Sequence, residues 1–335
     1  MKTLLVILMV IISGFTILSC NCESSKGYGN IHTVDKNSNP QVKKLFSNIK
    51  RYQDSVIIFG SEEGFVSKNI FGDYPGVFAW NFSKNFLSNA EMYKSQIIKA
   101  YSLGAVVMLD FSDFFNSEGY DKVVTSYSKL NGFLRGLEYG GNQIPLVLKF
   151  FPRQNVSGYW WSMGELSESG YIRLWHDGVR ILSDSLGLHN LLYVYSPCAG
   201  NGNIPYLYGF PGKEYVDIMG MEVYFSSKDI IQYAKFLAIK TDTLVNTAIA
   251  MNKPSAITGT SLKSANMSSW LCSTIVLALK QYDNRKVAWV TLMNGTTAKG
   301  DITEDSTLNF VEDLKKFKAS DLTVFLGDMP NMYND

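Results

Sequence analysis

The feature that most constrains the fold of this chain is a series of eight short apolar runs, separated for the most part by segments with helical periodicity. Each run is unbroken, which is typical of strands that are buried on both faces of a parallel sheet. The runs cover residues 55–60, 76–82, 105–110, 145–151, 190–195, 216–224, 254–258 and 287–292. Helical patterns lie near residues 40–49, 90–103, 120–137, 167–186, 227–251, 267–281 and 306–317. This alternation predicts an α/β fold, a single (β/α)8 TIM barrel.

An open, doubly wound sheet is the alternative fold for the same alternation. The chain has no glycine-rich phosphate loop after its first strand, which disfavours that alternative. A length of 335 residues suits one barrel of ordinary size. We therefore place the barrel over residues 39–335, with Asn39 as the N-cap of its first helix and Pro40 at the first helical position.

The N-terminus has the pattern of a targeting segment. Lys2 precedes an apolar run over residues 4–18, which is too short for an ordinary spanning helix. The Ile-Leu-Ser-Cys that ends at Cys20 resembles a bacterial lipoprotein box, and a plain secretory signal is the alternative. We expect a signal peptide over residues 1–19, lipidation of Cys20, and a flexible polar tether over residues 20–38. The expected location is the bacterial cell envelope, lipid-anchored in the outer membrane.

Composition narrows the range of partners. The net charge is +1, so nothing favours a nucleic-acid partner. No Cys or His cluster has the spacing of zinc ligands, and we expect neither a metal nor a cofactor.

A disulfide between Cys198 and Cys272 is compatible with an oxidising compartment, although their spacing does not argue for one. Aromatic residues make up 13% of the chain, and aromatic faces in a cleft hold sugar rings as well as filling cores.

Residues 144–164 carry the most informative motif, a buried strand that runs into an aromatic-rich loop. The segment resembles the strand-four motif of glycoside hydrolase family 26, the retaining endo-β-mannanases, which reads roughly R-P-F-H-E-M-N-G-x-W-F-W-W-G. Trp160 and Trp161 fall on the paired tryptophans of that motif, Asn155 on its Asn and Tyr159 on its Phe. Residues 71–77, 187–197 and 211–220 resemble further family segments in the same order, so the resemblance covers about residues 55–295. It implies a (β/α)8 barrel with its functional face at the C-terminal strand ends.

The resemblance also implies that both catalytic residues are replaced. Arg153 falls on the acid/base Glu of the strand-four motif, and Gly259 falls on the nucleophile of a K-P-x-A-x-T-E-T segment matched by residues 253–260. A retaining glycosidase needs two carboxyl groups about 5–5.5 Å apart. Glycine offers no nucleophile, and arginine stays protonated. The ends of strands two, three, six and eight depart from the family pattern as well.

Several residues remain candidates for a site at the barrel mouth. The ligand-binding candidates are Arg153, Asn155, Tyr159, Trp160, Trp161, Tyr224 and Asn294. Core packing is the alternative role for the aromatic residues, and a structural ion pair is the alternative for Arg153. Glu222 and Asp110 could form a relocated catalytic pair, or one of them could neutralise Arg153, because a buried charge needs a partner.

Our leading functional hypothesis is a non-catalytic lipoprotein that binds a β-mannan or a related glycan in the former active-site cleft. By analogy, its partners would be the membrane, through the lipid anchor, and a glycan-uptake complex. One alternative is an active endo-β-1,4-mannanase-like hydrolase that uses the displaced carboxylates Glu222 and Asp110. The other alternative is a structural or assembly protein whose barrel binds no ligand.

Overall fold

The computed structural model describes most of the chain from residue 32 onward. The described residues are 32–62, 64–65, 68, 72–200, 204–225, 230–262, 275–281, 287–293, 312–313 and 315–334. The expected signal peptide, Cys20 and most of the expected tether lie outside these residues, as do Cys272 and Asn294.

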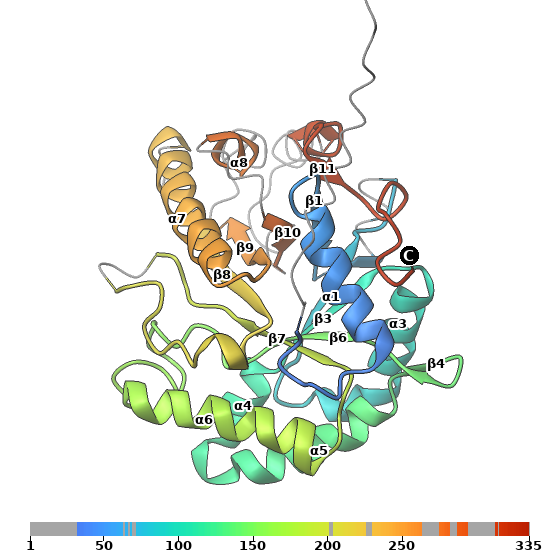
Figure 1. Cartoon of the computed structure of the whole chain (residues 1–335), viewed down its shortest axis with the longest axis vertical. Helices are drawn as coiled ribbons and strands as arrows, with labels where there is room; N and C mark the ends of the chain where they lie inside the picture. Colours follow the sequence, from blue (N-terminus) through green and yellow to red (C-terminus); the bar gives the residue numbers. More distant parts are fainter. Residues whose placement is uncertain are drawn as a thin grey trace, which may run out of the picture. The chain divides into compact units, whose positions relative to one another are not determined.

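Within the described residues, eight parallel strands form a closed barrel. They are β1 (Ile57–Ser61), β2 (Val77–Asn81), β3 (Val106–Asp110), β6 (Leu146–Lys149), β7 (Leu191–Tyr195), β8 (Ile218–Phe225), β9 (Ser255–Leu262) and β10 (Val287–Leu292). The barrel closes because β10 pairs in parallel with β1, for example through Trp289 and Ile58. Each strand falls on one of the eight apolar runs, which confirms the predicted TIM barrel. Figure 1 shows the strands in the centre with helices around them.

Helices fill most of the connections, as the periodicity predicts. They are α1 (Pro40–Tyr52), α3 (Ala90–Ser102), α5 (Val123–Arg135), α6 (Glu168–Arg180), α7 (Ile230–Ala250) and α8 (Leu277–Lys280). Asn39 caps α1 as expected, since its side-chain oxygen accepts a hydrogen bond from the backbone N–H of Val42 at 2.8 Å. Most of the helix predicted near residues 306–317 lies outside the described residues. No helix in the described part of the chain has the length and hydropathy that a membrane crossing requires.

The structure adds short elements that the sequence pattern does not predict. They are α4 (Ser112–Glu118), the single-turn helices η1 (Phe86–Asn89) and η4 (Lys213–Tyr215), the hairpin strands β4 (Glu138–Tyr139) and β5 (Asn142–Gln143), and β11 (Thr323–Val324). Two further short elements, the single-turn helix η2 (Tyr120–Lys122) and the π-helical turn η3 (Ile181–Ser185), lie within the predicted helical segments 120–137 and 167–186. α4 follows β3 directly and places Ser112 at the barrel mouth. These segments are too short to show a repeating hydrophobic pattern.

The segment before α1 is attached to the barrel. The carboxylate of Asp217 accepts hydrogen bonds from the backbone N–H groups of Val34 at 2.7 Å and Tyr193 at 2.8 Å. Asp35 lies 2.8 Å from Nδ1 of His189. The prediction of a flexible tether that extends to residue 38 is therefore wrong for residues 33–38, because these contacts order the segment.

A β-bulge marks the mouth end of β9. Met221 pairs with Ile257 and Glu222 pairs with Gly259, so that Thr258 is the extra residue on β9. Bulges often occur beside active sites, where they redirect side chains.

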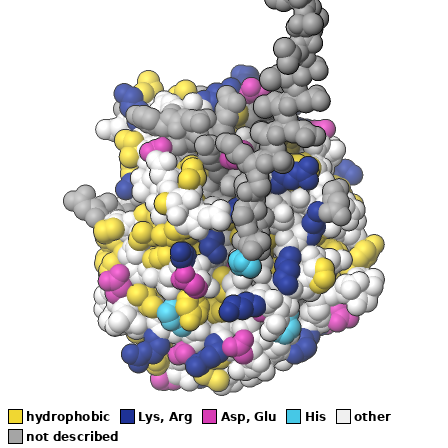
Figure 2. Space-filling model, viewed as in Figure 1, with side chains coloured by type: hydrophobic (Ala, Val, Ile, Leu, Met, Phe, Trp, Pro, Cys, Tyr) yellow, Lys and Arg dark blue, Asp and Glu magenta, His cyan; other side chains and the backbone are white. Residues whose placement is uncertain are grey.

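On the surface, basic and acidic side chains are mixed over the visible face (Figure 2). This mixture agrees with the small net charge of the chain.

Candidate functional site at the mouth of the barrel

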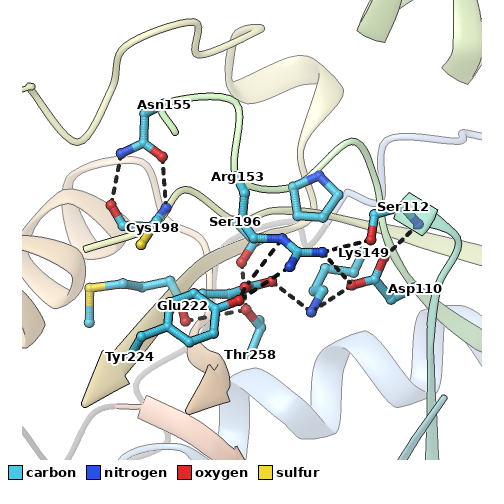
Figure 3. A network of polar contacts seen from close by, with 12 residues as sticks. Asp110, Ser112, Lys149, Arg153, Asn155, Ser196, Cys198, Glu222, Tyr224 and Thr258 are labelled. Atoms are coloured by element: carbon cyan, nitrogen blue, oxygen red, sulfur yellow. Dashed lines mark hydrogen bonds and ion pairs between the residues drawn. The ribbon is translucent and has the colours of Figure 1, made fainter. Parts of the chain in front are cut away.

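Lys149, the last residue of β6, lies at the centre of a buried ionic network. Its ammonium nitrogen is 2.8 Å from Oδ2 of Asp110 and 2.7 Å from Oε1 of Glu222 (Figure 3). The side chains of Lys149, Asp110 and Glu222 are 1%, 4% and 0% exposed. Asp110 ends β3, which pairs with β6, and Glu222 lies within β8, two strands from β6 on the other side. Both carboxylates point at the ammonium group of Lys149 (Figure 3).

Arg153 lies above this lysine and contacts the same two carboxylates. Its Nε is 3.5 Å from Oε2 of Glu222, and its Nη2 is 3.9 Å from Oδ2 of Asp110. Nη2 also donates to the hydroxyl of Ser112 at 2.7 Å, and Nη1 donates to the hydroxyl of Tyr224 at 3.3 Å. The guanidinium lies 4.7 Å from the ring centroid of Tyr159.

The backbone at Arg153 is in a conformation that favours glycine. Its φ is +60°, while its N–H donates to the carbonyl of Ser196 at 2.9 Å. A positive φ in a long side chain is uncommon and is retained where surrounding contacts fix it. Here the contacts of the guanidinium group with Glu222, Ser112 and Tyr224 hold Arg153 in this conformation.

Electrostatic attraction within the network keeps Asp110, Lys149 and Arg153 charged. Burial raises the pKa of Asp110, but the positive charges of Lys149 and Arg153 outweigh burial and leave this pKa below its ordinary value. Burial lowers the pKa values of Lys149 and Arg153, and the attraction of Asp110 and Glu222 more than reverses this, so both pKa values are raised. The two carboxylates and two cations therefore balance inside the barrel.

The tyrosines next to the network remain protonated. Burial raises the pKa of Tyr159 to about 12. Burial, followed by the charge of Glu222, raises the pKa of Tyr224 well above its ordinary value. Tyr224 donates its hydroxyl proton to Oε2 of Glu222. The Tyr224 hydroxyl is therefore a neutral hydrogen-bond donor to Glu222, beside Arg153.

The network leaves Asp110 and Glu222 poorly suited to glycosidase chemistry. An acid/base must exchange a proton with the leaving group, whereas the cations hold Asp110 ionised. A nucleophilic carboxylate must reach the sugar, whereas Glu222 is buried and contacts Lys149, Arg153 and Tyr224. The ammonium of Lys149 lies between the two carboxylates and contacts both (Figure 3).

Gly259 lies opposite Glu222 on β9. A Cβ atom built at Gly259 would lie 2.7 Å from Sδ of Met293 and 3.4 Å from Cγ of Glu222. The backbone of Gly259 is not in the left-handed region, so its φ does not require glycine. The neighbouring hydroxyls of Thr258 and Ser196 are 2.5 Å apart and close this side of the mouth.

The three aromatic residues of the loop differ in exposure. Trp161 is 0% exposed, and its indole N–H donates to the carbonyl of Pro152 at 3.0 Å. Its prediction as a sugar platform is therefore wrong, because a fully buried ring has no face for a ligand. Tyr159 stacks on Trp161 at 4.7 Å and is half-buried. Trp160 is also half-buried, and its N–H donates to the carbonyl of Phe115 at 2.9 Å.

Asn155 is held by backbone contacts. Its amide nitrogen donates to the carbonyl of Cys198 at 2.7 Å, and its amide oxygen accepts from the N–H of Cys198 at 2.8 Å (Figure 3). A pocket of about 300 Å³ opens beside this contact, and its lining includes Tyr206, Met221 and Lys240. Asn155 thus shapes a pocket next to the network while its polar atoms bind the loop after β7.

Lys149, the central cation of the site, is not among the residues predicted from the sequence. Its position inside the apolar run at residues 145–151 is the feature that indicates a role, because a lysine there must either be paired or leave the core. Its partners could not be identified from spacing, since they come from distant strands. Among the residues that the structure describes, no group of three His, Cys, Asp or Glu side chains is arranged to hold a metal ion.

Comparison with known proteins places this geometry in a family. The profile of glycosyl hydrolase family 26 matches residues 100–286, more than half of the chain. The chain belongs to glycosyl hydrolase family 26. This membership confirms the resemblance inferred from the strand-four motif and the three further segments.

Two curated relatives of family 26 are similar over part of their length. A mannan endo-1,4-β-mannosidase of Bifidobacterium adolescentis is 26% identical over 249 residues, which are 60% of this chain and 25% of that protein. A mannan endo-1,4-β-mannosidase of Bacillus subtilis is 24% identical over 244 residues, which are 63% of this chain and 64% of that protein. The chain thus spans from a quarter to just under two thirds of these relatives.

Solved structures of family 26 show the same fold. A family 26 protein of a Muricauda species superposes with a TM-score of 0.79 and 19% identity, over 90% of this chain and 96% of that one. A family 26 β-mannanase of Bacteroides ovatus superposes with a TM-score of 0.73 and 22% identity, over 89% of this chain and 98% of that one. At these identities the superpositions support the barrel and carry no argument about activity.

Proposed function

We propose that this chain is a non-catalytic family 26 barrel that binds a β-mannan or a related glycan at the cell envelope. The observation that carries the proposal is the ion pairing of Asp110 and Glu222 by Lys149 and Arg153. The residues aligned with the acid/base and the nucleophile are Arg153 and Gly259, so neither supplies a carboxyl group. The remaining carboxylates of this network are committed to buried cations.

The proposed ligand follows from the relatives and from the rim of the site. The curated relatives are named mannan endo-1,4-β-mannosidases, which suggests β-1,4-linked mannose units. Tyr159, Trp160 and Tyr224 are half-buried, so part of each ring is open at the mouth. Tyrosine and tryptophan pack a sugar ring on an apolar face and bind its hydroxyls at the edge. The pocket beside Asn155 offers about 300 Å³ for a sugar unit.

The envelope location is part of the proposal. The Ile-Leu-Ser-Cys sequence would place a lipid on Cys20, which anchors the barrel to the membrane. A lipid-anchored glycan binder would suit a glycan-uptake complex, a role proposed by analogy alone. Metabolic labelling with a fatty-acid analogue tests the anchor, and we expect Cys20→Ala to abolish the label.

A barrel without any ligand is the second candidate, and two observations favour it. Trp161 is buried, and the ionic network fills the centre of the mouth. Under that hypothesis the half-buried Tyr159 and Trp160 would pack the loop and bind nothing. Substituting Trp160 would then affect stability alone.

A paired assay distinguishes these functions. The purified protein is incubated with galactomannan, glucomannan and β-1,4-mannohexaose while reducing ends are followed, and the hexasaccharide is titrated by calorimetry. We expect binding without release of reducing ends, weakened in Trp160→Ala and unchanged in Tyr139→Ala, an exposed tyrosine on the β4–β5 hairpin. Turnover that disappears in Glu222→Gln would instead establish a relocated active site, and no binding at all would leave the barrel without a ligand.

A further inference from the structure

The chain enters the barrel at the end opposite the mouth. We call residues 33–38 the strap, which is bound to Asp217 and His189. Asp217 directly precedes β8, and His189 lies just before β7. The N–H of Asn39 also donates to the carbonyl of His189 at 3.0 Å. Because the mouth is formed where Lys149 ends β6, these contacts at the starts of parallel strands lie at the other end of the barrel.

The helix that follows the strap covers the same end of the barrel. α1 packs against β7 and β10, and Figure 1 shows it lying across the strands. Its apolar face is buried, and the side chains of this face are Val42, Leu45, Phe46 and Ile49. Lys50 is buried as well, and its ammonium group donates to the side-chain oxygen of Asn252, just before β9, at 2.7 Å. The strap and α1 are therefore firmly attached, and their outer surface has a fixed direction relative to the mouth.

The exposed surface of the strap and α1 is basic. Residues 32–52 contain five of the 31 lysine and arginine residues of the chain, but one of its 30 acidic residues. That acidic residue, Asp35, is buried beside His189. Lys36, Lys43 and Arg51 are exposed, and within the described part of the chain none of the three is ion-paired. The exposed carboxylate of Asp54 follows α1, so the basic side chains outnumber it on this surface.

The chain that would carry the lipid joins the barrel at this surface. Cys20 and His32 are 12 positions apart in the sequence, so the backbone between them spans at most about 40 Å. A lipid on Cys20 would therefore tether the strap end of the barrel, and not the mouth, to a bilayer. Anionic headgroups attract Lys and Arg side chains over about one Debye length, roughly 10 Å. The basic charge of this surface is complementary to such headgroups.

We infer that the strap and α1 form a membrane-facing surface, which docks on anionic phospholipid headgroups and directs the mouth of the barrel away from the bilayer. Lys36, Lys43 and Arg51 bind the headgroup phosphates. This inference rests on the envelope location in the proposed function, because a lipid on Cys20 brings this end of the barrel to the membrane. The orientation leaves the rim aromatics open to a polymer that approaches from the aqueous side.

Lysine footprinting of the mature protein on vesicles tests the inference. The protein is incorporated into vesicles of phosphatidylcholine alone or mixed with phosphatidylglycerol, and a membrane-impermeant acylating reagent labels its amines. Mass spectrometry gives the labelling rate of each lysine. We expect Lys36 and Lys43 to be labelled at least about fivefold more slowly on the anionic vesicles. Lys84, after β2, and Lys122, before α5, are exposed at the mouth end and should be labelled at equal rates on both.

Charge variants check that the protection is electrostatic. In the double variant Lys43→Gln/Arg51→Gln, the protection of Lys36 on anionic vesicles should disappear. The matched control Lys84→Gln/Lys122→Gln also removes two exposed positive charges and should retain the protection. Salt at about 1 M, where the Debye length is about 3 Å, should abolish the protection in the wild type as well.

The outcomes separate the docking surface from the anchor. If the mature protein carries a lipid but Lys36 and Lys43 are labelled equally on both kinds of vesicle, the docking surface is disproved and the proposed function stands. Slower labelling of Lys84 and Lys122 instead would show that the mouth faces the bilayer, which also overturns the inference. If the mature protein carries no lipid, the anchor fails, and sedimentation with the same vesicles then decides. Binding to anionic vesicles that weakens about tenfold or more in Lys43→Gln/Arg51→Gln would support the surface, and no binding would overturn it.

Discussion

Nε of Arg153 lies 3.5 Å from Oε2 of Glu222, so the arginine in the loop after β6 is ion-paired with a carboxylate of β8. Lys149 bridges the same carboxylate to Asp110 below. The mouth of this barrel therefore contains two carboxylates and two cations that compensate one another.

Replacing Lys149 should destabilise the protein strongly. In Lys149→Met, Asp110 and Glu222 lose the ammonium that compensates them in the interior, and removing one partner of a buried ion pair costs about 3–5 kcal/mol. The exposed pair of Lys129 and Glu118 provides the control, and Lys129→Met should cost less than about 1 kcal/mol. Urea unfolding gives both free energies. Equal values for the two variants would contradict the network as described.

Asp217 should make folding more favourable as the pH falls from about 6 to 4. Burial raises its pKa from 3.8 to about 6, against the lowering effect of the hydrogen bonds from Tyr193 and Val34. The native carboxyl thus binds a proton in a range where the unfolded chain does not, and stability from this group decreases as the pH rises through 6. A shift of about two units corresponds to about 3 kcal/mol.

The measurement is urea unfolding of wild type and Asp217→Asn between pH 4 and 7. The variant lacks the titrating group, so the difference in unfolding free energy between the two proteins should grow as the pH is lowered. Asp110, whose pKa is lowered, contributes in the opposite direction at more acidic pH in both proteins. A constant difference between wild type and Asp217→Asn would disprove the raised pKa.

Gly259 should tolerate a side chain better than Gly220. A Cβ at Gly259 meets the flexible side chain of Met293, which can move, so Gly259→Ala should cost about 1 kcal/mol or less. A Cβ at Gly220 would lie 2.8–2.9 Å from Val194, Thr258 and the carbonyl of Tyr195. Overpacking of this kind costs about 1–3 kcal/mol. Thermal unfolding of both variants shows which substitution is the more destabilising. If Gly259→Ala lowered the stability more than Gly220→Ala, the bulge would require glycine at position 259.

The paired tryptophans should respond differently to truncation. Trp161→Ala removes a fully buried ring and should cost about 3–5 kcal/mol. Trp160→Ala removes a half-buried ring, so it should cost less and should act mainly on mannohexaose binding. Urea unfolding and calorimetry on both variants give the comparison. If Trp160→Ala proved the more destabilising, the assignment of the core residue and the rim residue would be reversed.

Much of the fold could be predicted because its signals are local. Each buried strand is a continuous apolar run, and the cap of α1 is a side chain three residues from its partner. The strand-four motif was sufficient to identify the family. The order of residues 33–38 could not be predicted, since their polar composition resembles a tether and their contacts are with the distant residues Asp217 and His189.

The sequence by itself determined the order of the strands and the barrel. Tertiary structure alone decided which side chains meet at the mouth, because Asp110, Lys149 and Glu222 come from three different strands. It also decided that Trp161 is buried while its neighbour Trp160 reaches the rim. Composition and periodicity report how apolar a segment is, whereas ion pairing and ring exposure depend on distances between segments that are far apart in the chain.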